Sequence, residues 1–170
     1  MVASLELLDG GAPVAFTFAD MLRYHGPGSP GGVAHAFKVL ERALPVLGPD
    51  GPLERRAVHI RTAFGGPGAR DGFELVTRAV TEHRYVVDAS LVRPHRGPAA
   101  ERFVFCLTAA ETRATLVLRD GFVTDDFVRL AGKEDRSSEE ERVLAELKLA
   151  MADCVMGAAA ADVYDVVDDS

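Results

Sequence analysis

The sequence predicts an α+β fold in which a mixed or antiparallel sheet carries helices packed on one face. Helical and strand patterns are segregated along the chain: helical patterns dominate the first half, strand patterns follow, and a long helix comes last. Two neighbouring segments, 102–108 and 112–119, alternate in the way that is typical of an antiparallel pair of strands. A doubly wound parallel sheet would need strict alternation of strand and helix, which this order lacks.

Three helices are expected in the first half of the chain. Thr17 is a suitable N-cap for a helix over 18–24. A second helix is predicted by apolar residues spaced for one face, and Pro45 with the turn 48–52 is expected to end it. Its apolar stripe is Val33, Phe37, Leu40 and Leu44. A third helix is predicted over 71–81, with Phe73, Val76 and Val80 on its buried side.

Strand patterns lie between and after these helices. Residues 57–64 alternate, so His59 and Arg61 share the face opposite to that of Ile60 and Thr62. Residues 85–88 are predicted as a short strand. Asp120-Gly121 is a hairpin turn signal, which would continue the antiparallel strands into Phe122 and Val123.

The last part of the chain predicts a long helix followed by a loose tail. Ser138 and Glu141 have the spacing of a capping box. The apolar face of this helix is made by Val143, Leu144, Leu147, Met151 and Val155. The acidic tail 162–170 is expected to fray. The whole chain, 1–170, is interpreted as one domain with a long C-terminal helix.

Composition and charge exclude several function classes. The chain has 170 residues and a formal net charge of -7, and the lack of a basic stripe argues against nucleic-acid binding. No apolar run approaches the ~20 residues of a membrane helix, and the N-terminal segment lacks the features of a secretory signal, so a cytoplasmic location is expected. Cys106 and Cys154 are too far apart for a Cys-rich zinc motif, and both are interpreted as small buried residues.

Two junctions of one design precede predicted helices: Gly26-Pro27-Gly28 and Gly66-Pro67-Gly68. Glycine allows a ligand to approach the backbone closely, and a helix N-terminus favours an anion. Each junction is therefore a candidate seat for a carboxylate, phosphate or other oxyanion. The alternative interpretation is two tight turns, because neither junction matches a P-loop or a dinucleotide-binding motif.

Ionisable and polar residues lie beside both junctions. His25 and Ser29 belong to the first junction, and Arg70 and Asp71 follow the second. Histidine is the side chain best suited to acid–base chemistry near neutral pH. Structural alternatives remain for His59, as an ordinary sheet residue, and for Asp71, as an N-cap. His35, His83 and His95 are expected at the surface.

At these residues the chain resembles the FmdE family, which takes its name from a component of formylmethanofuran dehydrogenase. The family motif Phe-His-Gly-His-x-Cys-Pro-Gly is matched by the residues 24–31, Tyr-His-Gly-Pro-Gly-Ser-Pro-Gly, in which Pro27 and Ser29 replace the second His and the Cys. In the second motif Gly68 stands in place of a Cys and Asp71 matches the Asp. The resemblance covers roughly residues 15–130.

The resemblance implies an α+β core, usually dimeric, with a pocket built from both motifs that often holds a metal. The family's optional zinc ribbon is absent, because the sequence has no cysteine cluster. Without the motif cysteines a Cys-ligated zinc is not expected, since the soft ligands are missing. The cofactor is left open, and a divalent metal on His25 and His59, with Asp71, is one hypothesis.

The leading functional hypothesis is a small cytoplasmic FmdE-like enzyme that acts on a small polar or anionic metabolite between the two Gly-rich loops. His25, with Asp71 or His59 as partner, would move a proton. The residues expected to bind substrate are Gly26, Gly28, Ser29, Gly31, Arg61, Gly68 and Arg70. The alternatives are a non-catalytic small-molecule-binding accessory protein and a dimeric scaffold that uses the apolar face of the C-terminal helix. A homodimer is expected in either case.

Overall fold

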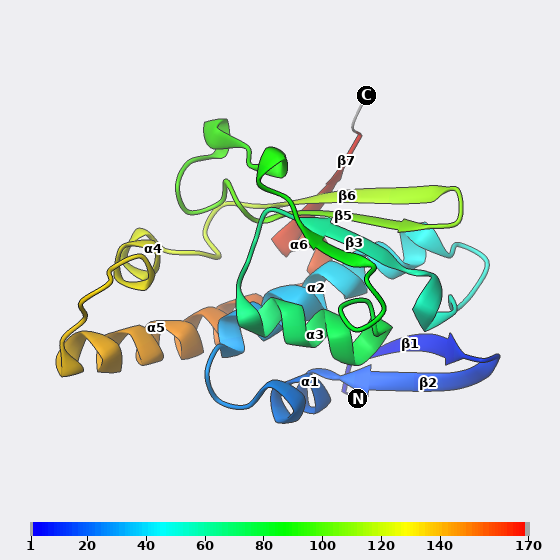
Figure 1. Cartoon of the computed structure of the whole chain (residues 1–170), viewed down its shortest axis with the longest axis horizontal. Helices are drawn as coiled ribbons and strands as arrows, with labels where there is room; N and C mark the ends of the chain where they lie inside the picture. The colour runs from blue at the N-terminus through cyan, green and yellow to red at the C-terminus, as the bar shows by residue number, and fades with distance from the viewer. Residues whose placement is uncertain (1, 169–170) are drawn as a thin grey trace.

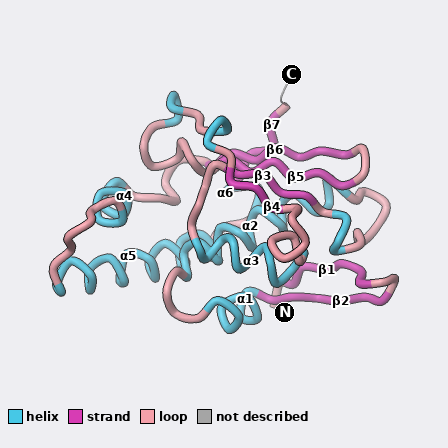
Figure 2. The backbone as a smooth tube through the Cα atoms, in the orientation of Figure 1, coloured by secondary structure: helices cyan, strands magenta, loops and turns pink. Residues whose placement is uncertain are grey.

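The computed structural model describes residues 2–168 and has the predicted α+β architecture. A five-stranded mixed sheet has the strand order β4-β3-β5-β6-β7, and β1 and β2 form a separate hairpin. In Figure 1 the large sheet lies above α2 and α3, while α1 and the hairpin lie below them; Figure 2 shows the same layers by type. The strands are β1 Ser4–Asp9, β2 Ala12–Thr17, β3 His59–Thr62, β4 Tyr85–Val87, β5 Val104–Ala109, β6 Thr112–Leu118 and β7 Tyr164–Val167. The helices are α1 Phe18–His25, α2 Pro30–Leu47, α3 Pro67–Thr77, α4 Asp125–Ala131, α5 Ser138–Met156 and α6 Ala160–Val163.

The β1–β2 hairpin is not among the predicted elements. Its turn uses Gly10 at φ +60° and Gly11 at φ +83°, a conformation that glycine adopts without a Cβ clash. The Glu54 carboxylate accepts hydrogen bonds from the backbone N–H groups of both glycines, at 3.0 and 2.7 Å. Leu5 and Leu7 alternate toward the core, so the hairpin closes the lower side of the helix layer.

The register of the large sheet separates an inner face from an outer face. Thr62 pairs with Phe105 and Phe105 with Leu116, so these side chains share the inner face. The ring of Phe105 lies 5.8 Å from that of Phe73 on α3, which identifies the inner face as the helix side. Arg61 pairs with Cys106 and therefore lies on the outer face. The predicted alternation of β3 is confirmed.

The bounds of two predicted helices are corrected by the structure. Pro45 lies inside α2 and does not end it, because Ala43 and Leu47 on either side are buried and hold the last turn against the core. The third helix begins at Pro67 and not at residue 71, since proline suits the first helical position. It ends at Thr77, where Arg78 adopts a left-handed conformation with φ 61°. The second Gly-rich junction is thus the first turn of α3.

The C-terminal third differs most from the expectation. Asp120-Gly121 does not make a hairpin; the chain continues through a loop into α4. The capping box of α5 is Ser137 with Glu140, one residue earlier than predicted. The tail does not fray over 164–167, because these residues form β7 and pair antiparallel with β6. Residues 169–170 of the predicted loose tail lie outside the described residues.

A buried polar pair joins His35 and Tyr164, which lie 129 positions apart in the sequence. His35, expected at the surface, is fully buried, and its Nδ1 lies 2.8 Å from the Tyr164 hydroxyl oxygen. Burial lowers the pKa of the His35 imidazole to about 3 and raises the pKa of the Tyr164 hydroxyl well above its ordinary value. Both groups are therefore neutral near pH 7. The pair ties α2 to β7 across the core.

The apolar face of α5 belongs to the core. Leu144, Met151 and Val155 are buried, and α5 packs against α2. Val143 and Leu147 of the predicted stripe are half-buried, so most of the surface on which the scaffold hypothesis depends is covered within the chain. In residues 2–168 no helix combines the length and the apolar character needed to cross a membrane.

Candidate functional site

The two Gly-rich junctions lie side by side, as the sequence predicted. The N-termini of α2 and α3 meet so closely that a Cβ on Gly68 would overlap the carbonyl oxygen of Ser29. A Cβ on Gly32 would likewise lie 3.0 Å from the backbone nitrogen of Ala69. Glycine is required at this contact because two backbones occupy the space of a side chain. The shared design of the junctions thus serves the packing of one helix start on the other.

A cavity of about 300 Å³ opens where the junctions meet. Ser29, Gly31 and Gly68 of the predicted site line it, together with one polar side chain from α5, Lys148. Its walls are mostly apolar and come from four different parts of the chain. They include Phe64, Phe103, Phe127 and Met151. The rings of Phe64 and Phe103 are stacked with centroids 4.3 Å apart, so one wall is aromatic.

Lys148 and the N-termini of α2 and α3 lie beside this cavity. Among the described residues, no side chain caps the first turn of α2 or of α3, and both helices carry proline at the start. Two helix dipoles therefore direct their positive ends toward the same region. Lys148 Nζ donates a hydrogen bond to the Gly28 carbonyl oxygen at 3.1 Å, which holds the ammonium group beside the first junction. The arrangement favours an anionic group next to an apolar body.

His25 and Asp71 form the pair that the sequence proposed. His25 Nδ1 lies 2.8 Å from Asp71 Oδ2, and the His25 side chain is 8% exposed. An ionised carboxylate only accepts hydrogen bonds, so this contact favours the tautomer with the proton on Nδ1. The other nitrogen, Nε2, is buried and has no hydrogen-bond partner in the described part of the chain. It lies 3.8 Å from the position that a Cβ on Gly28 would take.

The remaining predicted site residues are spread over three places. Gly26 and Gly28 line a different depression, of about 580 Å³, between the first junction and α5. Arg70 is exposed on α3, with its guanidinium 3.6 Å from the Asp71 carboxylate. His59 and Arg61 line a cavity on the outer face of the sheet, away from the helix layer.

The structure therefore corrects two assignments. His59 is not the partner of His25, and Arg61 does not reach the Gly-rich junctions, because strand alternation turns both side chains to the outer face. The metal hypothesis on His25 and His59 fails for the same geometric reason. Within residues 2–168, no three His, Cys, Asp or Glu side chains are grouped as metal ligands. Of the two cysteines predicted to be buried, Cys106 is buried and Cys154 is exposed.

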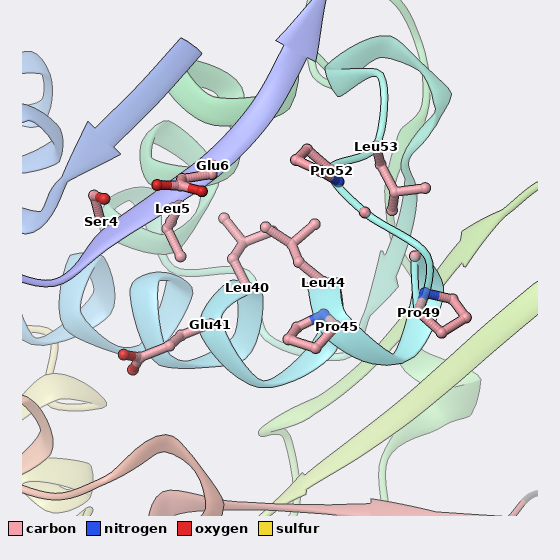
Figure 3. Close-up of a pocket in the computed structure, with 12 residues that line it drawn as sticks. Ser4, Leu5, Glu6, Leu40, Glu41, Leu44, Pro45, Pro49, Pro52 and Leu53 are labelled. Atoms are coloured by element: carbon pink, nitrogen blue, oxygen red, sulfur yellow. The ribbon is translucent and has the colours of Figure 1, made fainter. Parts of the chain in front are cut away.

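Another cavity, of about 430 Å³, lies between β1, the second half of α2 and the loop that follows α2. In Figure 3, Leu40 and Leu44 point from α2 toward Leu5 of β1, and Pro49, Pro52 and Leu53 lie along the loop. Glu41 projects from the opposite side of the helix. This cavity contains none of the predicted site residues and has no lysine, arginine or histidine among its described lining residues. It is a less suitable place for an anionic metabolite.

Sequence reasoning missed the residues that give the cavity at the junctions its character. Lys148 lies 120 residues from Gly28 along the chain, and on α5 it resembles any other residue of a polar helix face. Phe64 and Phe103 fit the alternating patterns of ordinary strand residues. Only the packing of α5 and of the loop before β5 against the junctions brings them together. No local signal marks any of the three.

The chain matches no protein-family model, and no curated protein sequence matches it. Membership of the FmdE family thus stays a prediction that depends on the motif residues of the two junctions.

Proposed function

We propose that the chain binds a small molecule that joins an anionic group, such as a carboxylate, to an apolar body. The observation that carries this proposal is the cavity of about 300 Å³ at the paired starts of α2 and α3, in which Lys148 is the charged lining residue. The volume is at the lower end of the range for small-molecule sites. The apolar body would lie on the Phe64–Phe103 stack, and the anion would lie between Lys148 and the helix N-termini.

Carboxylate probes test this proposal. We expect benzoate and hexanoate to shift the amide signals of Gly31 and Gly68 in NMR titrations, and benzyl alcohol and hexanol to bind at least about tenfold more weakly. The reason is that a hydrogen bond to a charged group contributes roughly 1.5–3 kcal/mol, and about 1.4 kcal/mol corresponds to a tenfold change in affinity. Lys148→Met keeps the apolar stem and removes the charge, so it should weaken carboxylate binding by a similar factor.

Lys133→Met is the matched control, because Lys133 is paired with Glu140 and does not line the cavity. It should leave carboxylate binding unchanged. Equal affinity for the acid and the alcohol of each pair would contradict an anion-binding site at this position. Equal carboxylate binding by the Lys148 and Lys133 variants would contradict it as well. A probe that shifts only the signals of Leu5 and Leu44 would place binding in the cavity of Figure 3.

The second candidate function is acid–base catalysis at His25 by an enzyme of the FmdE-like kind. The contact with Asp71 favours it, because a carboxylate on Nδ1 orients an imidazole and leaves Nε2 as a proton acceptor. A substrate for this function would bind at a different place from a ligand of the anion-binding site beside Lys148. His25 does not line the cavity at the junctions and its Nε2 is buried beside Gly28, so a substrate would reach this nitrogen only if the first junction moved aside.

The tautomer of His25 tests this second candidate. Long-range proton–nitrogen NMR spectra at pH 7.5 are expected to show the proton on Nδ1 and a free lone pair on Nε2. Asp71→Asn should reduce this preference, since an amide can donate to Nδ1 as well as accept from it. If Nε2 carries the proton in the unaltered chain, His25 has no basic nitrogen facing Gly28 and the catalytic role is refuted.

A further inference from the structure

The cavity on the outer face of the large sheet has a volume of about 270 Å³, and the proposed function does not use it. The strand register builds it. His59 on β3 pairs with Thr108 on β5, and Thr108 pairs with Arg113 on β6, so one row crosses three strands. Arg61 and Cys106 form the next row on the same face. His83 and Arg84, which precede β4, complete the rim.

The charge of this cavity is opposite to that of the whole chain. The chain has a formal net charge of -7, yet the described residues that line the cavity include three arginines and two histidines and neither Asp nor Glu. Clustered cations of this kind raise the local concentration of anions. The sequence predicts a catalytic or metal-binding role for His59 and substrate binding for Arg61, and the structure places both beside Arg84, Arg113 and His83 on a different surface.

Among the described residues, the carboxylates of Asp88 and Glu82 lie next to the arginines of the rim and outside the lining of the cavity. Asp88 accepts a hydrogen bond from Arg61, and its hydrogen bonds to Ser90 and to Arg61 lower the pKa of its carboxyl to about 2. Glu82 pairs with Arg84 at 2.6 Å, and Arg84 also donates to the Thr77 carbonyl oxygen. These contacts hold the two arginines in place, and neither carboxylate belongs to the described residues that line the cavity.

Arg113 completes the inner side of the cavity. Its Nη2 lies 3.9 Å from Cys106 Sγ, and the Thr115 hydroxyl lies 3.6 Å from the same sulfur atom. Cys106 is buried, and it lies on β5 between the strands that carry Arg61 and Arg113. An anion above this floor would meet a guanidinium from each of two strands.

We propose that this outer-face cavity binds the phosphate group of a small phosphorylated molecule. A guanidinium matches the geometry of phosphate oxygens with two parallel hydrogen bonds, and the histidines add donors on the β3 side. Phosphate is favoured over a carboxylate because its charge is larger and its oxygens reach donors in several directions. The cavity volume leaves space for a small organic body beside the phosphate group.

The test uses inorganic phosphate and glycerol 3-phosphate as probes of the full chain, at constant ionic strength in NMR titrations. We expect saturable shifts at Arg61, Cys106 and Arg113. Arg113→Gln and Arg61→Gln should each weaken binding by about tenfold or more, since each removes a charged donor. Arg129→Gln, which alters an exposed arginine on α4, is the matched control and should bind as the unaltered chain does.

The two probes distinguish the source of the phosphate. Tighter binding of glycerol 3-phosphate than of inorganic phosphate supports a phosphorylated metabolite, as proposed. Tighter binding of inorganic phosphate, or shifts spread evenly over the surface, would overturn the proposal, as would equal affinities of the Arg113, Arg61 and Arg129 variants. A circular dichroism spectrum of each variant establishes that a loss of binding is not a loss of fold. Carboxylate binding at the junctions is measured separately, so a negative result at one site does not affect the conclusion about the other.

Discussion

Tyr164→Ala is expected to lower the melting temperature of the protein by about 6–20 °C. Truncation of a large aromatic core residue costs roughly 3–5 kcal/mol, and each kcal/mol shifts the melting temperature of a chain of this size by about 2–4 °C. Tyr164 is fully buried, its ring lies 5.7 Å from that of Phe105, and its hydroxyl is the partner of His35. The variant loses apolar contacts and leaves a buried imidazole without its hydrogen bond.

Differential scanning calorimetry measures this effect, and Leu149→Ala is the control. Leu149 is 58% exposed on α5, so its truncation should change the melting temperature by less than about 2 °C. Tyr164→Phe keeps the ring and removes the hydroxyl, and should fall between the two. A Tyr164→Ala variant as stable as Leu149→Ala would show that β7 does not form part of the core.

The same buried pair predicts the sign of the response to acid. The pKa of His35 is about 3 in the folded chain and about 6.5 for an unperturbed imidazole. Between these values the unfolded chain binds a proton that the folded chain excludes, so stability falls as the pH drops below 6.5. NMR of His35 should show a neutral ring at pH 5. A protonated His35 at that pH, in a chain that is still folded, would contradict its burial.

Gly68→Ala is expected to destabilise the chain by about 1–3 kcal/mol, which corresponds to a fall of roughly 2–12 °C in melting temperature. Alanine is the better helix former by about 1 kcal/mol, and Gly68 lies in the first turn of α3, so propensity alone predicts the opposite sign. The clash decides the result, because the new Cβ overlaps the Ser29 carbonyl, which is backbone and cannot rotate away.

Gly65→Ala is the matched control for this prediction. The nearest atom to a Cβ on Gly65 is a Val87 side-chain carbon at 3.9 Å, an ordinary contact distance. Thermal unfolding of both variants, followed by calorimetry, gives the comparison. If Gly68→Ala melts at the temperature of Gly65→Ala or above, the two helix starts are not in contact and the cavity between them does not exist as described.

Local patterns in the sequence predicted the elements whose signals are local. The N-cap at Thr17, the apolar stripe of α2 and the alternation of β3 are all confirmed. The sequence misled where tertiary contacts override composition. Residues 162–168 are rich in aspartate and suggest a loose tail, but Tyr164 gains a buried position that only the folded sheet provides. Pro45 was expected to end a helix that its buried neighbours prolong.

The candidate site likewise combines features that have local sequence signals with features that only tertiary contacts create. The repeated Gly-Pro-Gly design predicted that the junctions meet, and the polar residues beside them predicted the pair of His25 with Asp71. The predicted partnership of His59 with His25 is wrong, although the alternation that places His59 opposite Ile60 is correct and visible in the sequence. Lys148 and the stacked rings of Phe64 and Phe103 had no local signal, because segments distant in sequence bring them to the cavity.

Helix α4 is held to the rest of the fold by few buried residues. The exchange rate of a bound ligand and the stability of the fold therefore depend on different contacts. Phe127 and Ala131 of this helix form part of the cavity wall, yet Leu130 is the one buried residue of its seven, and Phe127 and Val128 are only partly buried against the core. A segment with so little buried apolar area opens locally at a free energy far below that of global unfolding. A molecule held at the junctions would then enter and leave through transient detachment of α4, while the sheet and α2 stay folded. Residence time and melting temperature would therefore respond to different substitutions.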